Sequence, residues 1–248
     1  MDGIGTSISH TKALKYFKKA AKQDNIGAQH NYGKLLERNG KPYKAFKWFV
    51  RAAEKGNCRY SQHRLGELYL DGIGVENDDS TAFEWFQRAA NQEYSEAQLA
   101  LARMYFYGQG VSRSLKKSFE WALKAATSNE NGRAQYETGL NYLKGCGVEP
   151  STEEALKFLR KAADNEDADA QLLLSGRFHD GGFYEQAFKW YNMSAEKGNI
   201  LSQYNIGVMY KKGIGVAQSY SKSAEWYEKG FYKLLLETDY LSGKDLDF

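Results

Sequence analysis

Proline, cysteine and long apolar runs are all scarce in this chain. Two prolines, Pro42 and Pro150, occur among 248 residues, so proline bars little of the chain from forming helix. The two cysteines, Cys58 and Cys146, are too few for a disulfide framework or a cysteine-rich metal cluster, and they fit a reducing, cytoplasmic compartment. No run reaches the ~18 apolar residues that a membrane-spanning helix needs, so we expect no membrane span.

An excess of charge of either sign is also missing. Lys and Arg number 34 and Asp and Glu number 31, which gives a formal net charge of +3. Proteins that bind nucleic acid normally concentrate basic residues on one face, so this balance predicts no nucleic-acid partner. The densest basic cluster is Lys15, Lys18, Lys19 and Lys22. Its helical spacing and its lack of acidic neighbours are typical of a solvated helix face.

One pattern recurs six times along the chain. It consists of a small residue, Gln, two variable residues, an apolar residue, a small residue, two more residues and usually an aromatic ring. Successive glutamines are 33, 36, 37, 36 and 32 residues apart, and such a period indicates a repeat architecture. We call the helices that this pattern predicts the A helices. Their first pattern residues are Ala28-Gln29, Ser61-Gln62, Ala97-Gln98, Ala134-Gln135, Ala170-Gln171 and Ser202-Gln203.

A second pattern, rich in aromatic residues and ending in Ala-Ala, alternates with the first. It runs from Ala45 to Ala53 and again from Ala82 to Ala90. Its small and apolar positions fall three, four and seven apart, which places them in one stripe along a helix. Helices of about three turns are not stable alone. We therefore expect these B helices to pack on the A helices, a bulky ring of one lying over a Gly or Ala of the other. Further copies centre on Tyr16, Trp121, Phe158, Trp190 and Trp226.

The loops between A and B helices carry glycine at regular positions. A Gly-x-Gly-Val segment follows four A helices, and its first glycine suits a left-handed helix cap. Ser151 and Glu154 fit a capping box at the start of one B helix. Two units have tighter turns, at residues 39–42 and 180–182. The four loops begin at Gly72, Gly108, Gly145 and Gly213.

These units resemble the Sel-one-like repeat, a short α/α relative of the tetratricopeptide repeat. The resemblance lies in the Ala-Gln-x-x-Leu-Gly-x-x-Tyr of the A helices, the Gly-x-Gly-Val loops and the Ala-x-x-Trp-x-x-Lys-Ala-Ala of the B helices. It implies an all-α fold, a right-handed α/α superhelical solenoid, which serves mainly as an adaptor or scaffold. We expect residues 1–230 to form about six units that start on a B helix, and residues 231–248 to form a degenerate capping helix and a tail.

The first A helix is missing from this array, because Gly3-Ile-Gly5 reads as the loop that precedes a B helix. Met1 stands where Leu70 stands in the better unit, an odd place for a native start. We therefore expect that the chain is a fragment of a longer protein. In that case an upstream signal peptide would place it in the periplasm or outside the cell.

Several motifs imitate catalytic or binding sites. The Gly-x-Gly loops lack the preceding strand that a phosphate-binding loop needs, so we interpret them as structural turns. Ser-x-x-Lys, the nucleophile motif of penicillin-recognising enzymes, occurs four times, but Ser-Asp-Asn and Lys-Thr-Gly do not accompany it. Three of the matches lie at the start of a B helix, where Ser is a common N-cap. The serines are Ser9, Ser114, Ser194 and Ser219.

The histidines and acidic residues do not form a metal site in the sequence. His10, His30, His63 and His179 fall in separate units without metal-ligand spacing, and we expect neither a metal nor a cofactor. His30 and His63 both follow the repeated Gln, so stacked units would make them neighbours on one surface. An acidic loop lacks the central glycine of a calcium loop and reads as a solvated turn. Its members are Asp164, Glu166, Asp167 and Asp169.

The resemblance also locates a candidate partner-binding face. In tetratricopeptide relatives, the second, sixth, ninth and tenth residues after the small residue before Gln line the concave surface. In this chain the middle of that set is apolar and aromatic, which favours partner binding. The alternative is that Leu99, Leu140 and Leu172 pack between neighbouring units. The candidates are His30, Lys34, His63, Glu67, Leu70, Leu99, Arg103, Phe106, Tyr107, Tyr136, Leu140, Leu143, Leu172, His179, Tyr204, Val208 and Lys211.

The sequence therefore predicts a non-enzymatic scaffold that binds another protein in a concave groove. A bacterial source is expected, because compact arrays of this kind are frequent in bacteria. Two roles compete: an adaptor in signalling or envelope assembly, and an immunity-type protein that binds and neutralises a toxin. The runner-up class is a penicillin-recognising, β-lactamase-like enzyme. RNA binding by a helical array would need a basic groove, which the aromatic middle argues against.

Overall fold

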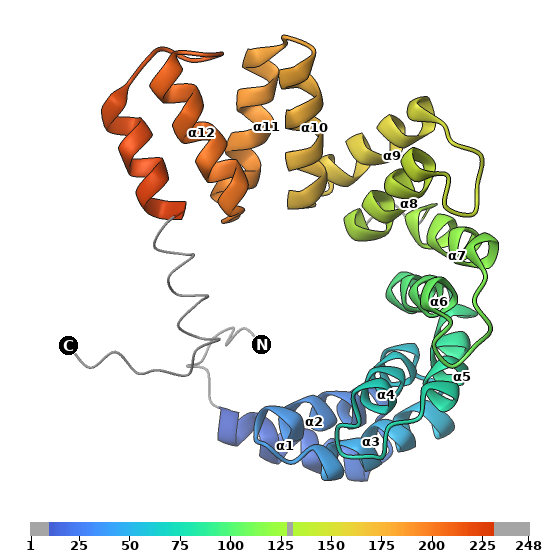
Figure 1. Cartoon of the computed structure of the whole chain (residues 1–248). Coiled ribbons are helices and arrows are strands. Elements are labelled where there is room, and N and C mark those ends of the chain that lie inside the picture. Colours follow the sequence, from blue (N-terminus) through green and yellow to red (C-terminus); the bar gives the residue numbers. More distant parts are fainter. Residues whose placement is uncertain (1–9, 128–130, 231–248) are drawn as a thin grey trace. The chain divides into compact units, whose positions relative to one another are not determined.

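A computed structural model describes residues 10–127 and 131–230, and in this part of the chain every regular element is a helix. The chain forms two compact units, Met1–Ser128 and Asn129–Phe248. The first unit holds α1 (His10–Lys22), α2 (Ile26–Arg38), α3 (Pro42–Lys55), α4 (Arg59–Asp71), α5 (Asp79–Ala90), α6 (Ser95–Tyr107) and α7 (Leu115–Thr127). The second holds α8 (Gly132–Lys144), α9 (Thr152–Asp164), α10 (Ala168–Asp180), α11 (Tyr184–Glu196), α12 (Ile200–Lys212) and a helical stretch over residues 220–230 (Figure 1).

A and B helices alternate as the sequence predicts. The even-numbered helices carry the repeated glutamine and are the A helices, while the odd-numbered helices and residues 220–230 are the B helices. Each A helix packs against the B helix that follows it, as the pairs α2–α3 and α10–α11 illustrate. The all-α solenoid of tandem helix pairs is therefore confirmed. The predicted capping helix and tail at residues 231–248 lie outside the described residues.

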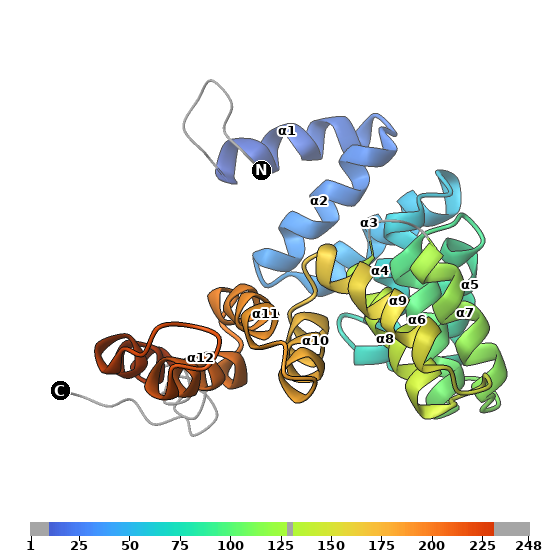
Figure 2. The same ribbon diagram turned by 90° about the horizontal axis from the view of Figure 1, so that it is seen from above.

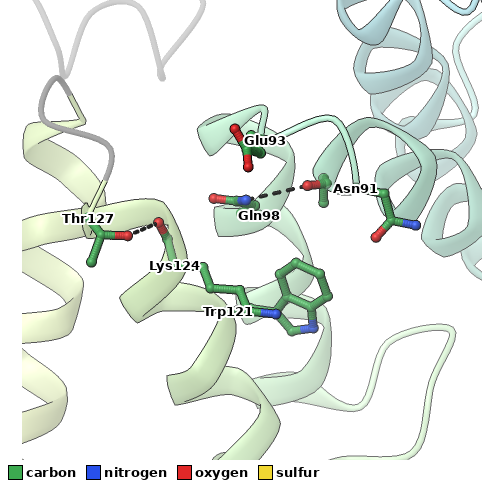
Figure 3. A pocket seen from close by; sticks show the side chains of 7 residues that line it. Asn91, Glu93, Gln98, Trp121, Lys124 and Thr127 are labelled. Atoms are coloured by element: carbon green, nitrogen blue, oxygen red, sulfur yellow. Dashed lines mark hydrogen bonds between the residues drawn. The ribbon is translucent and has the colours of Figure 1, made fainter.

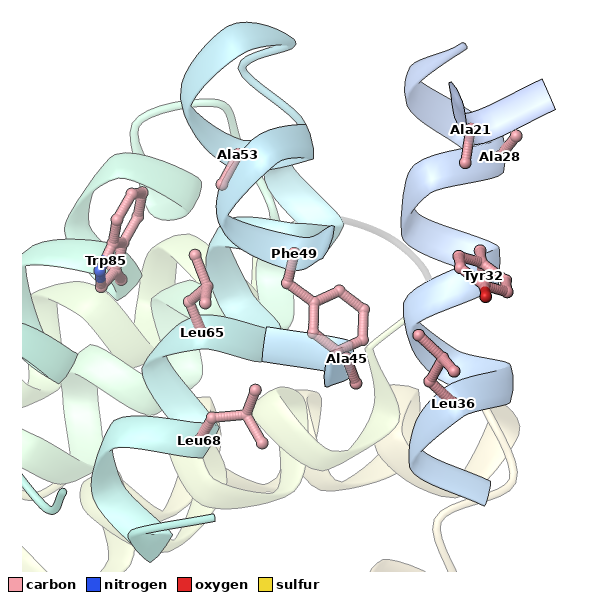
Figure 4. Close-up of a cluster of buried hydrophobic side chains, with 10 residues drawn as sticks. All are labelled: Ala21, Ala28, Tyr32, Leu36, Ala45, Phe49, Ala53, Leu65, Leu68 and Trp85. Carbon is pink, nitrogen blue, oxygen red and sulfur yellow. The ribbon is translucent and has the colours of Figure 1, made fainter. Parts of the chain in front are cut away.

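The close approach within several pairs depends on a small residue beneath a large side chain, which is a ring in α2–α3 and α4–α5 and Leu159 over Gly139 in α8–α9. Phe49 of α3 is fully buried against Gly33 of α2, where an added Cβ would lie 2.6 Å from the ring (Figure 4). Phe86 of α5 sits in the same way on Gly66 of α4, with 2.7 Å to the hypothetical Cβ. Distances this short leave no room for any side chain, so the expected ring-over-glycine contact is confirmed.

The recurring glutamine joins each A helix to the B helix before it. In five repeats its Nε2 donates a hydrogen bond to a carbonyl oxygen in the last turn of that B helix, which belongs to the second alanine of the Ala-Ala pair in four of them and to Ala195 of Ser194-Ala195 in the fifth. These side chains are almost completely buried, so each bond satisfies an amide nitrogen that would otherwise be costly to bury. The bonds are Gln29 to Ala21 (3.2 Å), Gln62 to Ala53 (3.4 Å), Gln98 to Ala90 (3.3 Å), Gln171 to Ala163 (3.0 Å) and Gln203 to Ala195 (3.0 Å).

The Gly-x-Gly-Val loops close the A–B pairs. Each first glycine lies in the left-handed region and caps its A helix, as predicted. The backbone N–H at the start of the next B helix then returns to the A helix: Ser114 N donates to Tyr105 O at 2.9 Å. Ser151 N does the same with Tyr142 O at 3.0 Å. Glu154 N donates to Ser151 Oγ at 3.2 Å, and the Glu154 carboxylate pairs with Lys157 at 2.7 Å. The predicted capping box is therefore formed in one direction.

In three of these loops the second glycine contacts the start of the preceding B helix, which ties successive repeats together: Gly74 lies against Pro42, Gly110 against Asp79 and Gly215 against Tyr184. Gly110 has φ +65°, and a Cβ there would collide with the carbonyl oxygen of Asp79 at the start of α5. Gly40, in a tight turn of the same unit, has φ +66° but nothing within 4 Å of its hypothetical Cβ.

We expect Gly110→Ala to lower the free energy of unfolding by about 3 kcal/mol or more, because backbone strain and a backbone clash add together. Gly40→Ala, with the strain alone, should cost about 1–2 kcal/mol. Urea unfolding of both variants, followed by circular dichroism, gives the comparison. Equal losses at the two positions would show that the loop does not press against α5.

Candidate functional site

The solvent-facing sides of the A helices carry the predicted partner-binding residues. In the first unit Lys34, Arg103 and Tyr107 are exposed, with Tyr107 at 72%. His30, His63, Glu67, Leu70 and Phe106 are half-buried, and Leu99 is buried at 6% exposure. The packing alternative therefore holds for Leu99, which belongs to the core of its unit.

Two of these residues belong to a cluster of rings in tilted and edge-to-face contact that crosses the N-terminal parts of three A helices. His30 of α2 lies 6.0 Å from Tyr60 of α4, and Tyr60 lies 5.3 Å from Tyr94 at the N-terminus of α6, as measured between ring centroids. His63 of α4 completes the group at 5.2 Å from Tyr94. We call these four residues the histidine–tyrosine cluster. The two histidines lie on one surface, as expected, and the two tyrosines link them.

Charged side chains flank this cluster. The Arg59 guanidinium lies over the rings of Tyr60 and Tyr94, at 5.1 and 5.8 Å from their centroids, and donates to the carbonyl oxygen of Gln92 at 3.3 Å. Arg64 bridges α2 and α4, because it donates to Glu37 of α2 and to Glu67 of its own helix, both at 2.7 Å. These contacts hold the A helices in register.

Burial sets the protonation of the cluster. Burial, together with the positive charge of Lys34, lowers the pKa of His30 to about 4. Burial also lowers the pKa of His63, against the opposing effect of the Glu67 and Glu96 carboxylates. The pKa of Tyr94 rises to about 12, again chiefly through burial. Near neutral pH His30, His63 and Tyr94 are therefore uncharged.

On the A helices of the second unit, some of the predicted partner-binding residues are exposed and others are packed. Tyr204 of α12 is 55% exposed, and its ring lies 5.6 Å from Tyr227. Lys211 is exposed, and Leu140, Val208 and His179 are half-buried. Tyr136 and Leu143 pack against the core beneath α9 and α10, and Leu172 packs against the core of α11 and α12.

Arg133 ties Tyr136 more firmly into the second unit. Its guanidinium lies 5.1 Å from the Tyr136 ring centroid and pairs with Asp169 of α10 at 2.6 Å. Tyr136 therefore packs partly against its neighbours, whereas the rings of Tyr107 and Tyr204 are largely exposed to solvent. Sequence reasoning selected all three but not Tyr60, Tyr94 or Arg59. Those residues precede the recurring small residue by one to three positions, outside the repeated pattern.

A surface pocket of about 580 Å³ in the first unit lies away from these residues. It opens between the α5–α6 turn and α7, and Lys124 Nζ lies 4.3 Å from the centroid of the Trp121 ring (Figure 3). Gln98 lines one side and donates to the carbonyl oxygen of Ala90. None of the predicted partner-binding residues lines it. The arrangement of Trp121 and Lys124 recurs at Trp85–Arg88 and Trp226–Lys229, which indicates a structural role.

The other motifs have structural roles where the structure describes them. Ser114 and Ser219 are N-caps that accept from the N–H of Lys117 and Lys222. Ser194 is fully buried and donates to the carbonyl oxygen of Ala168, while Ser9 lies outside the described residues. In the acidic loop, Asp167 caps α10 by accepting from Ala170 N at 2.8 Å.

Over residues 10–127 and 131–230, no group of three or more His, Cys, Asp or Glu side chains is arranged to hold a metal ion. None of the helices there is long and apolar enough to cross a membrane.

Comparison with known families identifies the repeat. The Sel1 repeat model matches the chain seven times and covers most of its length, so the chain belongs to the Sel1 repeat family. The first match, residues 1–25, is the shortest and contains α1. The matched residues are 1–25, 27–57, 59–94, 95–130, 132–167, 168–199 and 200–231.

Individual relatives agree with this assignment. The chain is 28% identical to chitin synthase regulatory factor 3 of Schizosaccharomyces pombe over 98% of its own length and 24% of that protein, so it spans about a quarter of that relative. A Sel1 repeat protein from Oxalobacter formigenes has a similar structure, with a TM-score of 0.82 and 27% identity over 90% of this chain and 94% of that one. A protective antigen of uropathogenic Escherichia coli gives 0.77 and 31%, over 91% and 50%.

Solved immunity proteins are more distant. An immunity protein of Pseudomonas aeruginosa, Pa5087, matches with a TM-score of 0.55 and 18% identity over 84% of this chain and 81% of that one. A likeness at this level shows a shared fold alone.

The depressed pKa of His30 predicts a pH-dependent stability. The unfolded chain takes up this proton near pH 6.5 and the folded chain near pH 4, so the unfolded chain binds more protons between these values. The contribution of neutral His30 is therefore complete above pH 6.5 and is lost as the pH falls toward 4, by on the order of 2–3 kcal/mol.

His30→Gln should flatten this part of the pH profile, which urea titrations at pH 7.0, 5.5 and 4.5 would measure. His179→Gln is the matched control, because His179 is half-buried at the surface of the second unit. A His30→Gln profile as steep as that of the parent chain would contradict the prediction.

Proposed function

We propose that this chain is a non-enzymatic scaffold that binds another protein through the exposed faces of its A helices. Membership of the Sel1 repeat family supports this role, and a relative that aligns over nearly the whole chain is named as a regulatory factor. The fold alone does not define a function, so the argument rests on particular side chains.

The exposed tyrosines of the A helices carry the proposal. The recurring residues serve the packing of the fold and are not exposed to a partner. Gln62 and Gly66, for example, are buried against the neighbouring B helices. At positions that differ between repeats, large rings face solvent instead, as Tyr107 and Tyr204 do. Tyrosine is a frequent hot-spot residue, because it supplies a large contact area at a low cost in conformational entropy. The occupant is an extended segment or a helix of the partner.

Within the scaffold class, we propose an adaptor in a signalling or envelope assembly of a bacterium. The alternative is an immunity-type protein that binds and neutralises a toxin. The Pseudomonas immunity protein shares the fold alone with this chain. A reducing, cytoplasmic compartment is our proposal for its location, since Cys58 and Cys146 are free cysteines. Identification of the bound partner would decide between the two roles.

A penicillin-recognising enzyme is a weaker hypothesis for this chain than a scaffold. Its motif needs an accessible serine, whereas Ser194 is fully buried and Ser114 and Ser219 begin B helices. Labelling with a fluorescent penicillin tests it directly, because an acyl-enzyme would retain the dye through denaturing electrophoresis.

We expect Tyr107→Glu and Tyr204→Glu each to weaken partner binding by about tenfold or more, because a charge would be buried in the interface. Wild-type and variant chains are immobilised, and proteins retained from a lysate of the source cell are compared by quantitative mass spectrometry. The partner is the protein that the parent chain retains and the variants lose.

Matched controls lie on B helices of the same units. Tyr43→Glu in α3 and Tyr220→Glu in the last described helix alter tyrosines that are 62% and 67% exposed. Both controls should retain the partner. Loss of the partner in the controls but not in Tyr107→Glu or Tyr204→Glu would move the interface to the B helices.

A further inference from the structure

A tight turn joins α2 to α3 in the first unit (Figure 2). Its first two residues, Asn39 and Gly40, form an Asn-Gly dipeptide. The backbone nitrogen of glycine is little hindered, because glycine has no Cβ, and it is placed to attack the side-chain amide carbon of the asparagine before it. A second Asn-Gly dipeptide, Asn131-Gly132, begins α8 in the second unit. The structure distinguishes the two dipeptides by how firmly each is held.

Little restrains the dipeptide between α2 and α3. Asn39 and Gly40 are both exposed, and nothing lies within 4 Å of the hypothetical Cβ of Gly40. In the described part of the chain the Asn39 side chain forms no hydrogen bond. The nitrogen of Gly40 donates one bond, to Glu37 O at 2.9 Å, which has to open before the nitrogen attacks. Exposed hydrogen bonds at helix ends open readily, so this turn admits the reaction.

The dipeptide at the start of α8 is held on both sides. Asn131 caps the helix, because its Oδ1 accepts from Ala134 N at 2.9 Å. Gly132 is buried, and a Cβ added to it would lie 3.0 Å from Asn165 O. Attack by the Gly132 nitrogen therefore requires both the loss of the cap and the opening of a packed helix start. The fold protects Asn131 and leaves Asn39 reactive.

We propose that Asn39-Gly40 is a site of spontaneous covalent modification, at which Asn39 is converted into aspartate and isoaspartate. The Gly40 nitrogen forms a bond to Cγ of Asn39, and its proton leaves with the amide nitrogen as ammonia. The product is a cyclic succinimide. Water then opens this ring at one of its two carbonyl carbons. Opening at Cγ gives aspartate, and opening at the main-chain carbonyl carbon gives isoaspartate. The reaction consumes one water, releases one ammonia and involves no oxidant.

Both products alter the end of α2. A carboxylate at position 39 lies at the negative end of the helix dipole, which disfavours it. Isoaspartate also carries the main chain through its Cβ and so lengthens the turn. Two bonds depend on that length, from Gly40 N to Glu37 O and from Lys41 N to Leu36 O, both at 2.9 Å. The modification therefore loosens the α2–α3 pair as the protein ages.

Ageing of the full chain tests the proposal. The protein is incubated at pH 8.5 and 37 °C, and samples are digested at acidic pH, where digestion itself causes little deamidation. Mass spectrometry follows the two peptides that contain Asn39 and Asn131, and chromatography separates aspartate from isoaspartate. We expect Asn39 to convert at least about tenfold faster than Asn131, because only Asn131 has to break a cap and open a packed helix start. Isoaspartate should appear among the products at position 39.

Two controls separate the fold from the local sequence. In guanidinium chloride neither the turn nor the cap exists, so Asn39 and Asn131 should convert at similar rates. Asn39→Gln should give no product at this turn, because glutamine would have to close a larger ring. Asn39→Asp copies one product and should unfold at a lower urea concentration than Asn39→Gln, because it places a charge at the end of α2.

Three results would overturn the proposal. Equal rates at the two sites of the folded chain would show that the fold does not protect Asn131. Conversion in guanidinium chloride but not in the folded chain would show that the turn at Asn39 is closed to the reaction. Aspartate without isoaspartate would exclude the succinimide. No partner protein enters this experiment, so its outcome is independent of the proposed interface on the A helices.

Discussion

Close approach between an A helix and the following B helix is the constraint on which the rest of this structure depends. Phe49 can lie against Gly33 because no side chain stands between the two backbones, and Phe86 lies on Gly66 for the same reason. That separation lets the loop N–H groups return to the A helix, as Ser114 does to Tyr105. Three-turn helices have little stability of their own, so the fold is the sum of these contacts, repeated along the chain.

Much of this architecture could be predicted because the sequence pattern of the A helix recurs six times along the chain. Helix alternation, the left-handed caps and the small residue under a ring all follow from recurrence and local geometry. The role of the recurring glutamine could not be predicted, since its partner is a carbonyl on a different helix whose position only the packing defines. The same limit explains Ser151: its hydroxyl caps the helix as expected, but its N–H is already taken by Tyr142 O.

The predicted partner-binding face also combines features that the sequence predicts with features that only the packing defines. Tyr107 and Tyr204 were selected by register and are exposed, because register alone decides which side of an A helix a residue occupies. Whether a residue on that side is also covered depends on the neighbouring repeat, and so Leu99 is buried while Tyr136 lies beneath Arg133. The contact between Tyr60 and Tyr94 could not be predicted, because both residues flank the repeated pattern and meet only when successive A helices pack side by side.

The same packing requirement is met by different residues along the array. Gly33 and Gly66 lie under phenylalanine rings, whereas Gly139 lies under Leu159. The sides of the A helices that face solvent are free of this requirement, and there Tyr107 and Tyr204 expose large rings. Because each repeat contacts chiefly its neighbours, a substitution at such an exposed position leaves the packing of the array unchanged. The architecture therefore separates the residues that hold the fold together from the residues that can change what the scaffold contacts.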